Sequence, residues 1–478
     1  MAGPPAGYRR EADSLGTMDV PGDVYWGVHT ARALVNFPIS RRAIGVYPDL
    51  IHAYADVKQA SARANAELGT IDPHIAELID RACEEIRGGA LLDQFVVGVI
   101  QGGAGTSTNM NVNEVIANRA LELGGWGKGE YQRISPIDHV NRSQSTNDTY
   151  PTAVKIALVY AMRRLLVEHA LLRDAFAAKG REFRNVLKIG RTQLQDAVPM
   201  TLGQEFRGFA NTLTMDNDRL TESIWVVSDI NMGATAIGTG ITADPRFSAT
   251  VLRHLNQITG LDLEIAGDLI EATSDAGSFM TLSGTLKRAA VKLSKICNDL
   301  RLLSSGPQAG FGEINLPARQ AGSSIMPGKI NPVIPEAVNQ VAFSIIGADA
   351  TVTAAAEAGQ LQLNAFEPVI THSLLQSIVW LTGACQTLRV NCIDGITANE
   401  SKLAGDVAVS VGVVTALTPY IGYARAAQLA HEALTSNASI ADLVVSAGLL
   451  TRAEVERLLQ PDRLSGTIAP TTAMPRME

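Results

Sequence analysis

Residues 277–304 read GSFMTLSGTLKRAAVKLSKICNDLRLLS and carry the repeat that decides the fold class. Apolar residues recur there at alternating steps of three and four, at Phe279, Leu282, Leu286, Ala289, Leu293, Ile296, Leu300 and Leu303. In an α-helix this spacing lines one side with apolar groups along the whole length. Such a helix needs an equally long helical neighbour to cover that side. The repeat therefore predicts a bundle of long helices.

Four other stretches show helical periodicity at comparable length. They are expected over residues 151–176, 202–232, 334–363 and 366–390. Pro151 is an accepted residue in a first helical turn, and Thr201 with Gln204 forms a capping-box pair before the second stretch. Five long helices carry more apolar surface than one bundle can cover. We therefore expect the chain to self-associate through these helices.

The two ends of the chain differ from this centre. Residues 1–145 have shorter elements and more turn residues, which predicts a mixed, mostly helical N-terminal domain. Residues 146–397 are expected to form the helix-bundle domain, with a flexible loop at 321–333. Residues 398–478 are expected to form a small C-terminal helical domain, in which Thr451 and Glu454 cap a helix. The expected fold class is mainly α, with three domains.

Composition and charge exclude several classes of function. The 478 residues include 40 basic and 48 acidic ones, a net charge of −8 without a basic run, so no nucleic-acid partner is expected. Residues 1–16 lack the apolar core of a signal peptide. Residues 407–424 carry no charge, but polar residues and Pro419 interrupt them, which favours a buried helix over a membrane span. A cytoplasmic protein without membrane contact is expected.

Cysteine and histidine show no metal-site spacing. Cys83, Cys297, Cys385 and Cys392 form no CxxC pair, which favours buried free thiols, and the eight histidines are scattered. The sequence has no nucleotide-binding glycine motif and no zinc-protease motif. We therefore expect no metal site. His29 is interpreted as a structural residue, with a catalytic role as the alternative.

Four polar segments lie at the ends of the apolar patterns. They read GGAGTSTN (102–109), SQSTND (143–148), GRTQLQD (190–196) and GSSIMPGKINP (322–332). Hydroxyl and amide groups at helix N-termini form anion sites, although any one segment alone is interpreted equally well as a cap or turn. The last segment places Lys329 among residues that cannot be helical. A loop that closes over a substrate is expected there.

Together these segments resemble the aspartase/fumarase superfamily. Its pattern GSSxMPxKxN is matched by residues 322–331, and the resemblance extends over residues 27–459. Within the superfamily, the stretches at 25–30 with 36–40, at 190–200 and at 355–364 are similar to aspartate ammonia-lyases. Class II fumarases usually have GSGTQS where this chain has GAGTST at 103–108, and His where it has Gln193. A class II fumarase and an inactive structural protein on the same fold are the alternatives.

The resemblance implies a reaction and an assembly. The reaction is the reversible deamination of L-aspartate to fumarate and ammonia by a carbon–nitrogen lyase, in which the Cβ proton leaves to give an aci-carboxylate intermediate. The assembly is a homotetramer with a tetrameric helical core, in which each active site is shared among three subunits. The resemblance implies no organic cofactor, and it leaves open activation by a divalent cation such as Mg²⁺.

The resemblance also assigns roles to individual residues. Ser323 matches the catalytic serine of the superfamily and would be the base, while Lys329 would stabilise the intermediate and contact the substrate. The remaining assignments are substrate-binding side chains: the hydroxyls of Thr106, Ser145, Thr146 and Thr192, the amides of Asn147 and Gln193 at the amino group, and Asn331 at the α-carboxylate.

Overall fold

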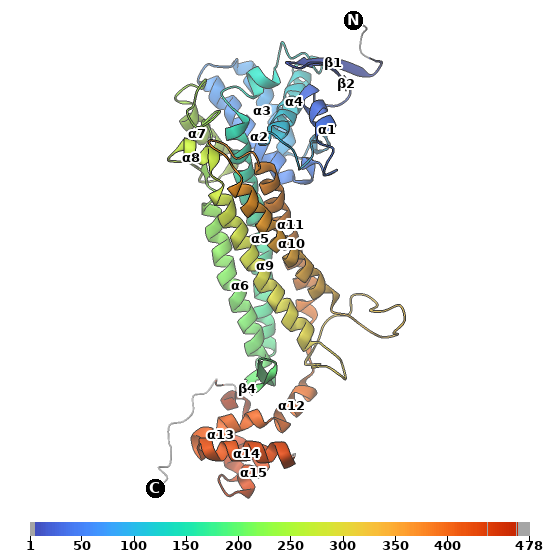
Figure 1. Ribbon diagram of the computed structural model, residues 1–478, viewed down its shortest axis with the longest axis vertical. Helices are drawn as coiled ribbons and strands as arrows, with labels where there is room; N and C mark the ends of the chain where they lie inside the picture. The colour runs from blue at the N-terminus through green and yellow to red at the C-terminus, as the bar shows by residue number, and fades with distance from the viewer. Residues whose placement is uncertain (1–4, 437, 465, 467–478) are drawn as a thin grey trace. The chain divides into compact units, whose positions relative to one another are not determined.

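The computed structural model describes residues 5–436, 438–464 and 466, and most of these residues are helical (Figure 1). The chain divides into two compact units. The first comprises the described residues of Met1–Leu166, Asp218–Ala290 and Phe343–Thr382. The second comprises the described residues of Val167–Asn217, Val291–Ala342 and Gly383–Glu478. The expected domain borders after residues 145 and 397 remain predictions.

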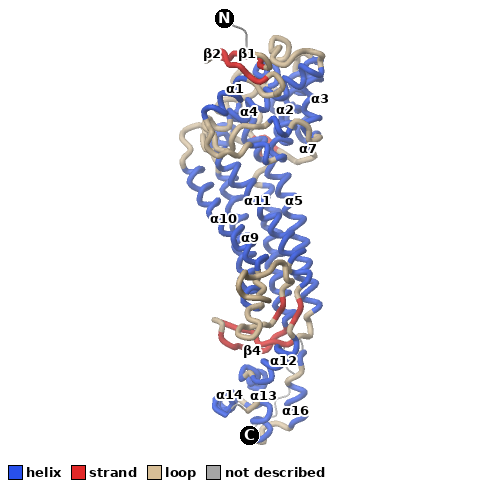
Figure 2. The backbone as a smooth tube through the Cα atoms, turned by 90° about the vertical axis from the view of Figure 1, so that its right-hand side faces the viewer, coloured by secondary structure: helices blue, strands red, loops and turns tan. Residues whose placement is uncertain are grey.

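Five long helices are present, as the apolar repeats predict. They are α5 (Thr146–Glu182), α6 (Leu202–Trp225), α9 (Gly277–Leu303), α10 (Val333–Glu357) and α11 (Glu367–Asn391). Each contributes residues to both units, and within each unit their segments run side by side (Figures 1 and 2). Every residue of the apolar repeat from Phe279 to Leu303 is buried. The predicted mainly α fold with a long-helix bundle is confirmed.

Three predicted helix borders are wrong. Helix α5 begins at Thr146, five residues before Pro151, so this proline lies inside the helix. Helix α6 ends at Trp225 because the chain enters the short strand β5 (Asp229–Ile230). Helix α10 ends at Glu357, and Leu361 beyond it has a left-handed φ of 55°. In the last two cases the apolar pattern continues past a local change of backbone direction.

The first unit also contains shorter helices and strands. These are β1 (Tyr8–Asp13), β2 (Gly16–Pro21), α1 (Val28–Asn36), α2 (Pro48–Glu67), α3 (Pro73–Arg87), α4 (Thr106–Leu123), α7 (Phe247–Thr259), β6 (Glu264–Ile265) and α8 (Leu269–Ser274). Strands β1 and β2 form an antiparallel hairpin, and β5 pairs in parallel with β6. Helix α2 packs against α3 and α7 (Figure 1). Most of α2, including Lys58, is buried.

The second unit contains a hairpin and the C-terminal helices. Its elements are β3 (Leu187–Thr192), β4 (Gln195–Thr201), β7 (Ile314–Asn315), β8 (Thr397–Ala398), α12 (Glu400–Val409), α13 (Val414–Ile421), α14 (Tyr423–Ser436), α15 (Ile440–Ser446), α16 (Arg452–Leu458) and α17 (Pro461–Leu464). The predicted capping box of Thr451 and Glu454 is present at α16. Leu417, Leu429 and Val444 belong to one apolar core.

The uncharged stretch 407–424 is divided among several elements. It includes the end of α12, a 3-10 turn at Val411–Val413 and all of α13. No single helix in the described chain is long and apolar enough to cross a membrane. The pair Glu400–Val409 and Val411–Ile421, bent by 69°, passes that test of length and composition together. All four cysteines are free and buried, as predicted.

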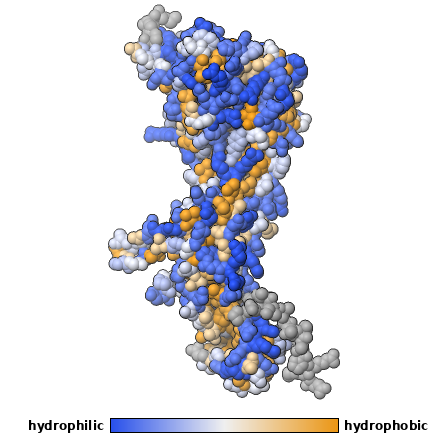
Figure 3. Space-filling model, turned by 180° about the vertical axis from the view of Figure 1, so that it is seen from behind, coloured by the Kyte–Doolittle hydropathy of each residue, from blue (hydrophilic) through white to orange (hydrophobic). Residues whose placement is uncertain are grey.

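Several large apolar side chains on the long helices are exposed. In the first unit Phe343 is 62% and Val379 46% exposed, and in the second unit Val167 is 58% and Met215 60% exposed. On the face drawn in Figure 3, apolar residues gather over the long helices. These side chains leave apolar helix surface uncovered in a single chain.

Candidate functional site

The segment 102–109 makes a tight turn into α4. Gly103, Ala104 and Gly105 all have left-handed φ angles, of 83°, 52° and 89°. Gly105 lies against the ring of Tyr150 on α5, where any Cβ would overlap the ring. Thr106 is the first residue of α4 and its hydroxyl donates to the carbonyl of Gly103 at 2.7 Å. The turn therefore places an exposed Thr106 at a helix N-terminus.

The segment 143–148 leads directly into α5. The backbone N–H of Asn147 donates to Ser145 Oγ at 3.2 Å, and that of Ser145 donates to Asp148 Oδ1 at 2.9 Å. Asp148 is fully buried and also accepts from the backbone N–H groups of Gly233 and Thr235. Burial raises the pKa of Asp148 to about 7, against the opposing effect of these N–H groups. The carboxyl group thus fixes the turn that presents Ser145, Thr146 and Asn147.

Asn109 joins these two segments. Its Nδ2 donates to Thr146 Oγ1 at 3.1 Å, and both residues are buried. Asn147 is held separately, because its Nδ2 donates to the carbonyl of Ala236 at 2.7 Å. The structure therefore brings the first and second polar segments together within the first unit, with Thr106, Ser145, Thr146 and Asn147 at the beginnings of α4 and α5.

The segment 190–196 forms the tip of the β3–β4 hairpin in the second unit. Thr192 pairs with Gln195, and the two residues between them, Gln193 and Leu194, have φ angles of 53° and 64°. Two left-handed residues give the tight turn whose twist suits a hairpin. The side chains of Thr192 and Gln193 are exposed at this tip.

A buried cluster of charges holds the base of this hairpin. Lys188 Nζ lies 2.6 Å from carboxylate oxygens of both Glu205 and Glu313, and Arg191 pairs with Glu313. The guanidinium of Arg191 also stacks over the ring of Phe311, at 4.2 Å from its centroid. The cluster contains two positive and two negative groups, so their pairing offsets the cost of burying each charge. The cluster fixes the hairpin that carries Thr192 and Gln193.

The segment 322–332 is a loop bonded largely to itself. Ser323 Oγ accepts from the backbone N–H groups of Ile325 at 3.2 Å and Met326 at 3.0 Å. The N–H of Gly322 donates to the carbonyl of Lys329 at 2.8 Å, and Asn331 Nδ2 donates to the carbonyl of Gly322 at 2.8 Å. These bonds bring Ser323, Lys329 and Asn331 into one loop of the second unit.

The apolar side chains of this loop are exposed. Ile325 is 83% exposed and Ile330 56%, and the side chain of Lys329 is exposed as well. Ile325, Met326 and Ile330 are all exposed in this one loop, and a group of exposed apolar side chains marks a binding or interaction site. This composition suits a loop that covers a ligand.

Beneath the first unit's segments lies a polar network that the sequence reading did not predict. Helix α4 has asparagines at 109, 111, 113 and 118, and all four are buried. Lys58 on α2 is also fully buried, and burial lowers its pKa to about 7, with Asp148 opposing this effect. Buried amides have to form hydrogen bonds, so a run of asparagines inside an apolar helix is a usable sequence signal.

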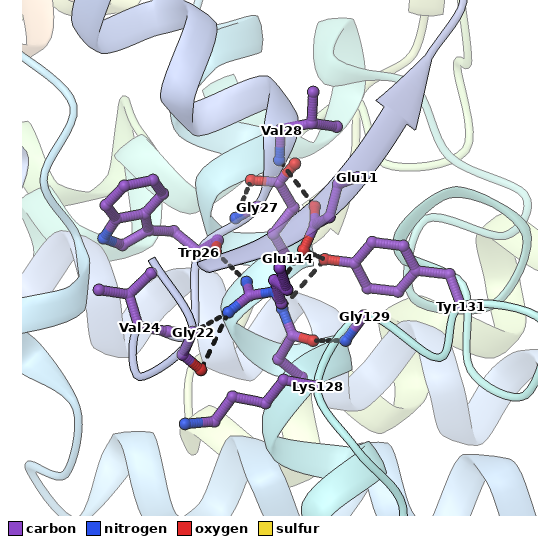
Figure 4. Close-up of polar contacts among 12 residues, drawn as sticks. Glu11, Gly22, Val24, Trp26, Gly27, Val28, Glu114, Lys128, Gly129 and Tyr131 are labelled. Atoms are coloured by element: carbon purple, nitrogen blue, oxygen red, sulfur yellow. Dashed lines mark hydrogen bonds and ion pairs between the residues drawn. The ribbon is translucent and has the colours of Figure 1, made fainter. Parts of the chain in front are cut away.

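Two buried glutamates, Glu114 on α4 and Glu11 on β1, hold the start of α1 (Figure 4). Glu114 accepts from the backbone N–H groups of Gly27, His29 and Thr30, and Glu11 accepts from that of Val28. These N–H groups belong to the first turn of α1, where negative charge is favourable. His29 therefore contributes a backbone contact, and burial lowers the pKa of its ring.

Within residues 5–436, 438–464 and 466, no group of three or more His, Cys, Asp or Glu residues is placed to hold a metal ion.

Comparisons with known proteins match almost the whole chain. The family model for lyases covers residues 16–347, and that for the fumarase C C-terminus covers residues 413–466. An aspartate ammonia-lyase of Pseudomonas canavaninivorans is 56% identical over 96% of this chain and 97% of its own. That of Escherichia coli K12 is 51% identical over 95% of this chain and 96% of its own.

The chain belongs to the aspartate ammonia-lyases of the aspartase/fumarase superfamily.

Solved structures agree with the placement in the superfamily. A fumarate lyase:delta crystallin from Brucella melitensis, bound to cobalt, is 52% identical with a TM-score of 0.93, over 96% of this chain and 99% of its own. A class II fumarase from Schistosoma mansoni has a TM-score of 0.89 over 96% and 99%, but only 33% identity. These proteins share the fold, whereas the sequence is nearer to the aspartate ammonia-lyases, at 51–56% identity, than to this class II fumarase.

Proposed function

We propose that this chain catalyses the reversible deamination of L-aspartate to fumarate and ammonia. The observation that carries this proposal is 51–56% identity to aspartate ammonia-lyases over 95–96% of the chain. The identity to the class II fumarase is 33%. Gln193, where class II fumarases usually have His, favours the same choice.

The reaction requires removal of a weakly acidic proton from Cβ. Negative charge then spreads into the neighbouring carboxylate and gives an aci-carboxylate, which preorganised donors and a cation can stabilise. Lys329 is the proposed cation, because it lies in the same loop as the proposed base. We assign the hydroxyls of Thr106, Ser145, Thr146 and Thr192 to substrate carboxylates, Asn147 and Gln193 to the amino group, and Asn331 to the α-carboxylate.

Ser323 is the proposed base, acting as an alkoxide. An ordinary serine hydroxyl is too weak an acid for this role, so the loop has to stabilise the oxygen's negative charge. Two backbone N–H groups, those of Ile325 and Met326, already donate to Ser323 Oγ. Hydrogen bonds to the charged form favour that form, which supports the assignment.

The proposed assembly is a homotetramer whose active sites each draw on three subunits. The exposed apolar side chains of the long helices, such as Phe343 and Met215, support association through these helices. Light scattering at micromolar concentration is expected to give four times the 50.7 kDa chain mass. A monomeric mass would refute the assembly. Mixing inactive Ser323→Ala chains with impaired Thr146→Val chains is expected to give mixed tetramers more active than either variant alone, because some sites then combine intact segments.

We further propose that the reaction needs no organic cofactor and takes place in the cytoplasm, with a small molecule as the only substrate and no nucleic-acid or membrane partner. Activation by a divalent cation such as Mg²⁺ is tested by dialysis against a chelator, followed by stepwise addition of the metal. Unchanged activity after dialysis would argue against activation.

One assay tests the proposed function. Purified protein is mixed separately with L-aspartate and with L-malate, and fumarate is followed by its ultraviolet absorbance. Fumarate from aspartate alone, with matching ammonia, is the expected result. Fumarate from malate alone would make the chain a fumarase. Activity with neither substrate from a folded protein would support a structural role or another lyase substrate.

A further inference from the structure

The side chain of Asn141 is the centre of the buried network below the start of α5. Its Oδ1 accepts from Lys58 Nζ at 3.0 Å and from the Nδ2 atoms of Asn109 and Asn113, both at 3.1 Å. Lys58 Nζ also donates to Gln144 Oε1 at 2.9 Å. One amide oxygen therefore receives three donors from two helices, α2 and α4.

The backbone carbonyl of Gln144 fixes the direction of these hydrogen bonds. This carbonyl can only accept, so the atom of Asn141 that faces it at 3.2 Å has to be Nδ2. The atom of Asn141 that faces Lys58 is then the oxygen, which accepts from Lys58 Nζ. With this oxygen fixed, Asn109 has to present its NH₂ group to Asn141.

The same NH₂ group reaches Thr146. Asn109 Nδ2 has two hydrogens, and the second points to Thr146 Oγ1 at 3.1 Å. On its other side, Asn109 Oδ1 lies 3.3 Å from the hydroxyl of Thr149. Thr146 is thus an acceptor in this bond, and its own hydroxyl hydrogen remains available. Among the described residues, none accepts that hydrogen.

We propose that Asn109 is a positioning residue that holds the Thr146 hydroxyl as a hydrogen-bond donor toward a substrate carboxylate. The inference rests on the proposed function, in which Thr146 binds the substrate. A hydroxyl that can rotate freely spends part of its time with a lone pair toward the carboxylate, which repels it. Asn109 removes that orientation before the substrate arrives.

Asn113 provides a matched control. It lies one turn further along α4, is equally buried and donates to the same Asn141 oxygen at the same distance. It makes no bond to Thr146. Both Asn109→Ala and Asn113→Ala remove one donor from Asn141, which retains Lys58 and the other asparagine. A general loss of packing would affect both variants alike.

The experiment measures kcat and KM for L-aspartate in tetrameric Asn109→Ala, Asn113→Ala, Thr146→Val and Asn109→Ala/Thr146→Val, with Tm as a check on folding. We expect Asn109→Ala to lose about ten-fold in kcat/KM, the scale of one hydrogen bond to a charged group, and Asn113→Ala less than about three-fold. In the Thr146→Val background, Asn109→Ala is expected to add no further loss. Equal losses in the two alanine variants, or additive losses in the double variant, would overturn the inference.

A further variant tests the direction of the bond. Asn109→Asp keeps the size of the side chain but presents acceptors to Thr146, whose hydroxyl hydrogen would then turn inward. Asn109→Asp is therefore expected to lose more kcat/KM than Asn109→Ala. The opposite order would mean that Asn109 only fills space. Full activity of Thr146→Val would instead refute the substrate role of Thr146, whereas a loss there with an active Asn109→Ala would refute the positioning role alone.

Discussion

Asn231 Nδ2 donates to the backbone carbonyl of Asn147 at 3.0 Å, and this carbonyl is the one that Pro151 leaves without a helical partner. Proline has no N–H, so the bond from residue 151 to residue 147 cannot form. The amide of Asn231 takes its place from a position 84 residues away in the chain. This hydrogen bond from Asn231 lets α5 extend back to Thr146 and so present Asn147 in its first turn.

Replacing Asn231 is therefore expected to weaken both folding and catalysis. Asn231→Ala leaves the partly buried carbonyl of Asn147 unpaired, which costs about 1 kcal/mol. We expect a Tm lower by several degrees and a higher KM for aspartate. Pro151→Ala restores a backbone N–H, so Asn231→Ala is expected to cost less in that background. Additive effects of the two substitutions on Tm would contradict this relationship.

Ser323 and its neighbour Ser324 provide a direct test of the base. Ser323 Oγ accepts two backbone N–H groups and is the proposed alkoxide, whereas Ser324 is an exposed residue of the same loop. Ser323→Ala is expected to abolish turnover, by about a thousand-fold or more, while Ser324→Ala retains most of it. The measurement is the rate of fumarate formation by each tetramer. Similar losses in both variants would remove Ser323 from the role of base.

Lys329→Ala is expected to weaken binding of the transition state more than binding of the substrate. Loss of a cation that contacts a developing dianion should cost roughly 3 kcal/mol or more, about a hundred-fold in kcat/KM. Lys402→Ala is the control, because Lys402 is another lysine of the second unit and pairs with Asp406 on α12. A near-normal kcat/KM for Lys329→Ala would refute its stabilising role.

Glu114 is expected to make stability depend on pH. Burial raises its pKa from 4.5 to about 7, despite the hydrogen bonds from Thr30, His29 and Gly27. A raised carboxyl pKa gives a contribution to stability that is complete below the unfolded pKa and is lost as pH rises through the folded pKa. Between about pH 5 and pH 7.5, Tm should therefore fall less in Glu114→Gln than in the unmodified protein.

The control for this prediction lies on the same helix. The pKa of Glu122 is lowered, mainly by the hydrogen bond from Tyr25. Its contribution to stability therefore changes only at pH values below its ordinary pKa. Glu122→Gln should leave the Tm profile in this pH range unchanged in shape. Parallel profiles for Glu114→Gln and the unmodified protein would show that Glu114 does not titrate there.

The sequence predicts the long helices because their signal is local. The apolar repeat at 277–304 needs only the 3.6-residue period, and it is buried throughout as expected. The start of α5 could not be predicted in this way, because the partner that replaces the missing N–H of Pro151 is Asn231. Local rules predict proline in the first turn of a helix, whereas in the folded chain Pro151 lies beyond the first turn of α5.

The candidate site likewise contains residues that local sequence patterns predict and residues that depend on partners distant in the chain. The hydroxyl and amide residues can be predicted because they interrupt apolar patterns, and the structure places those of 102–109 and 143–148 together. The network of Lys58, Asn141 and Asn109 cannot be predicted in this way, since its members come from three separate segments and meet only after folding. The asparagines at 109, 111, 113 and 118 are the one local signal of it.

The four buried cysteines offer a way to follow local unfolding of the chain. Burial raises the pKa of Cys385 and Cys392 to about 12 and raises that of Cys83 well above the ordinary value, so few thiolates exist for alkylation while the fold is closed. Cys83 belongs to the first unit, whereas Cys297, Cys385 and Cys392 belong to the second. Timed alkylation with peptide mapping would therefore record the opening of each unit separately, using only reporters that the natural sequence already contains.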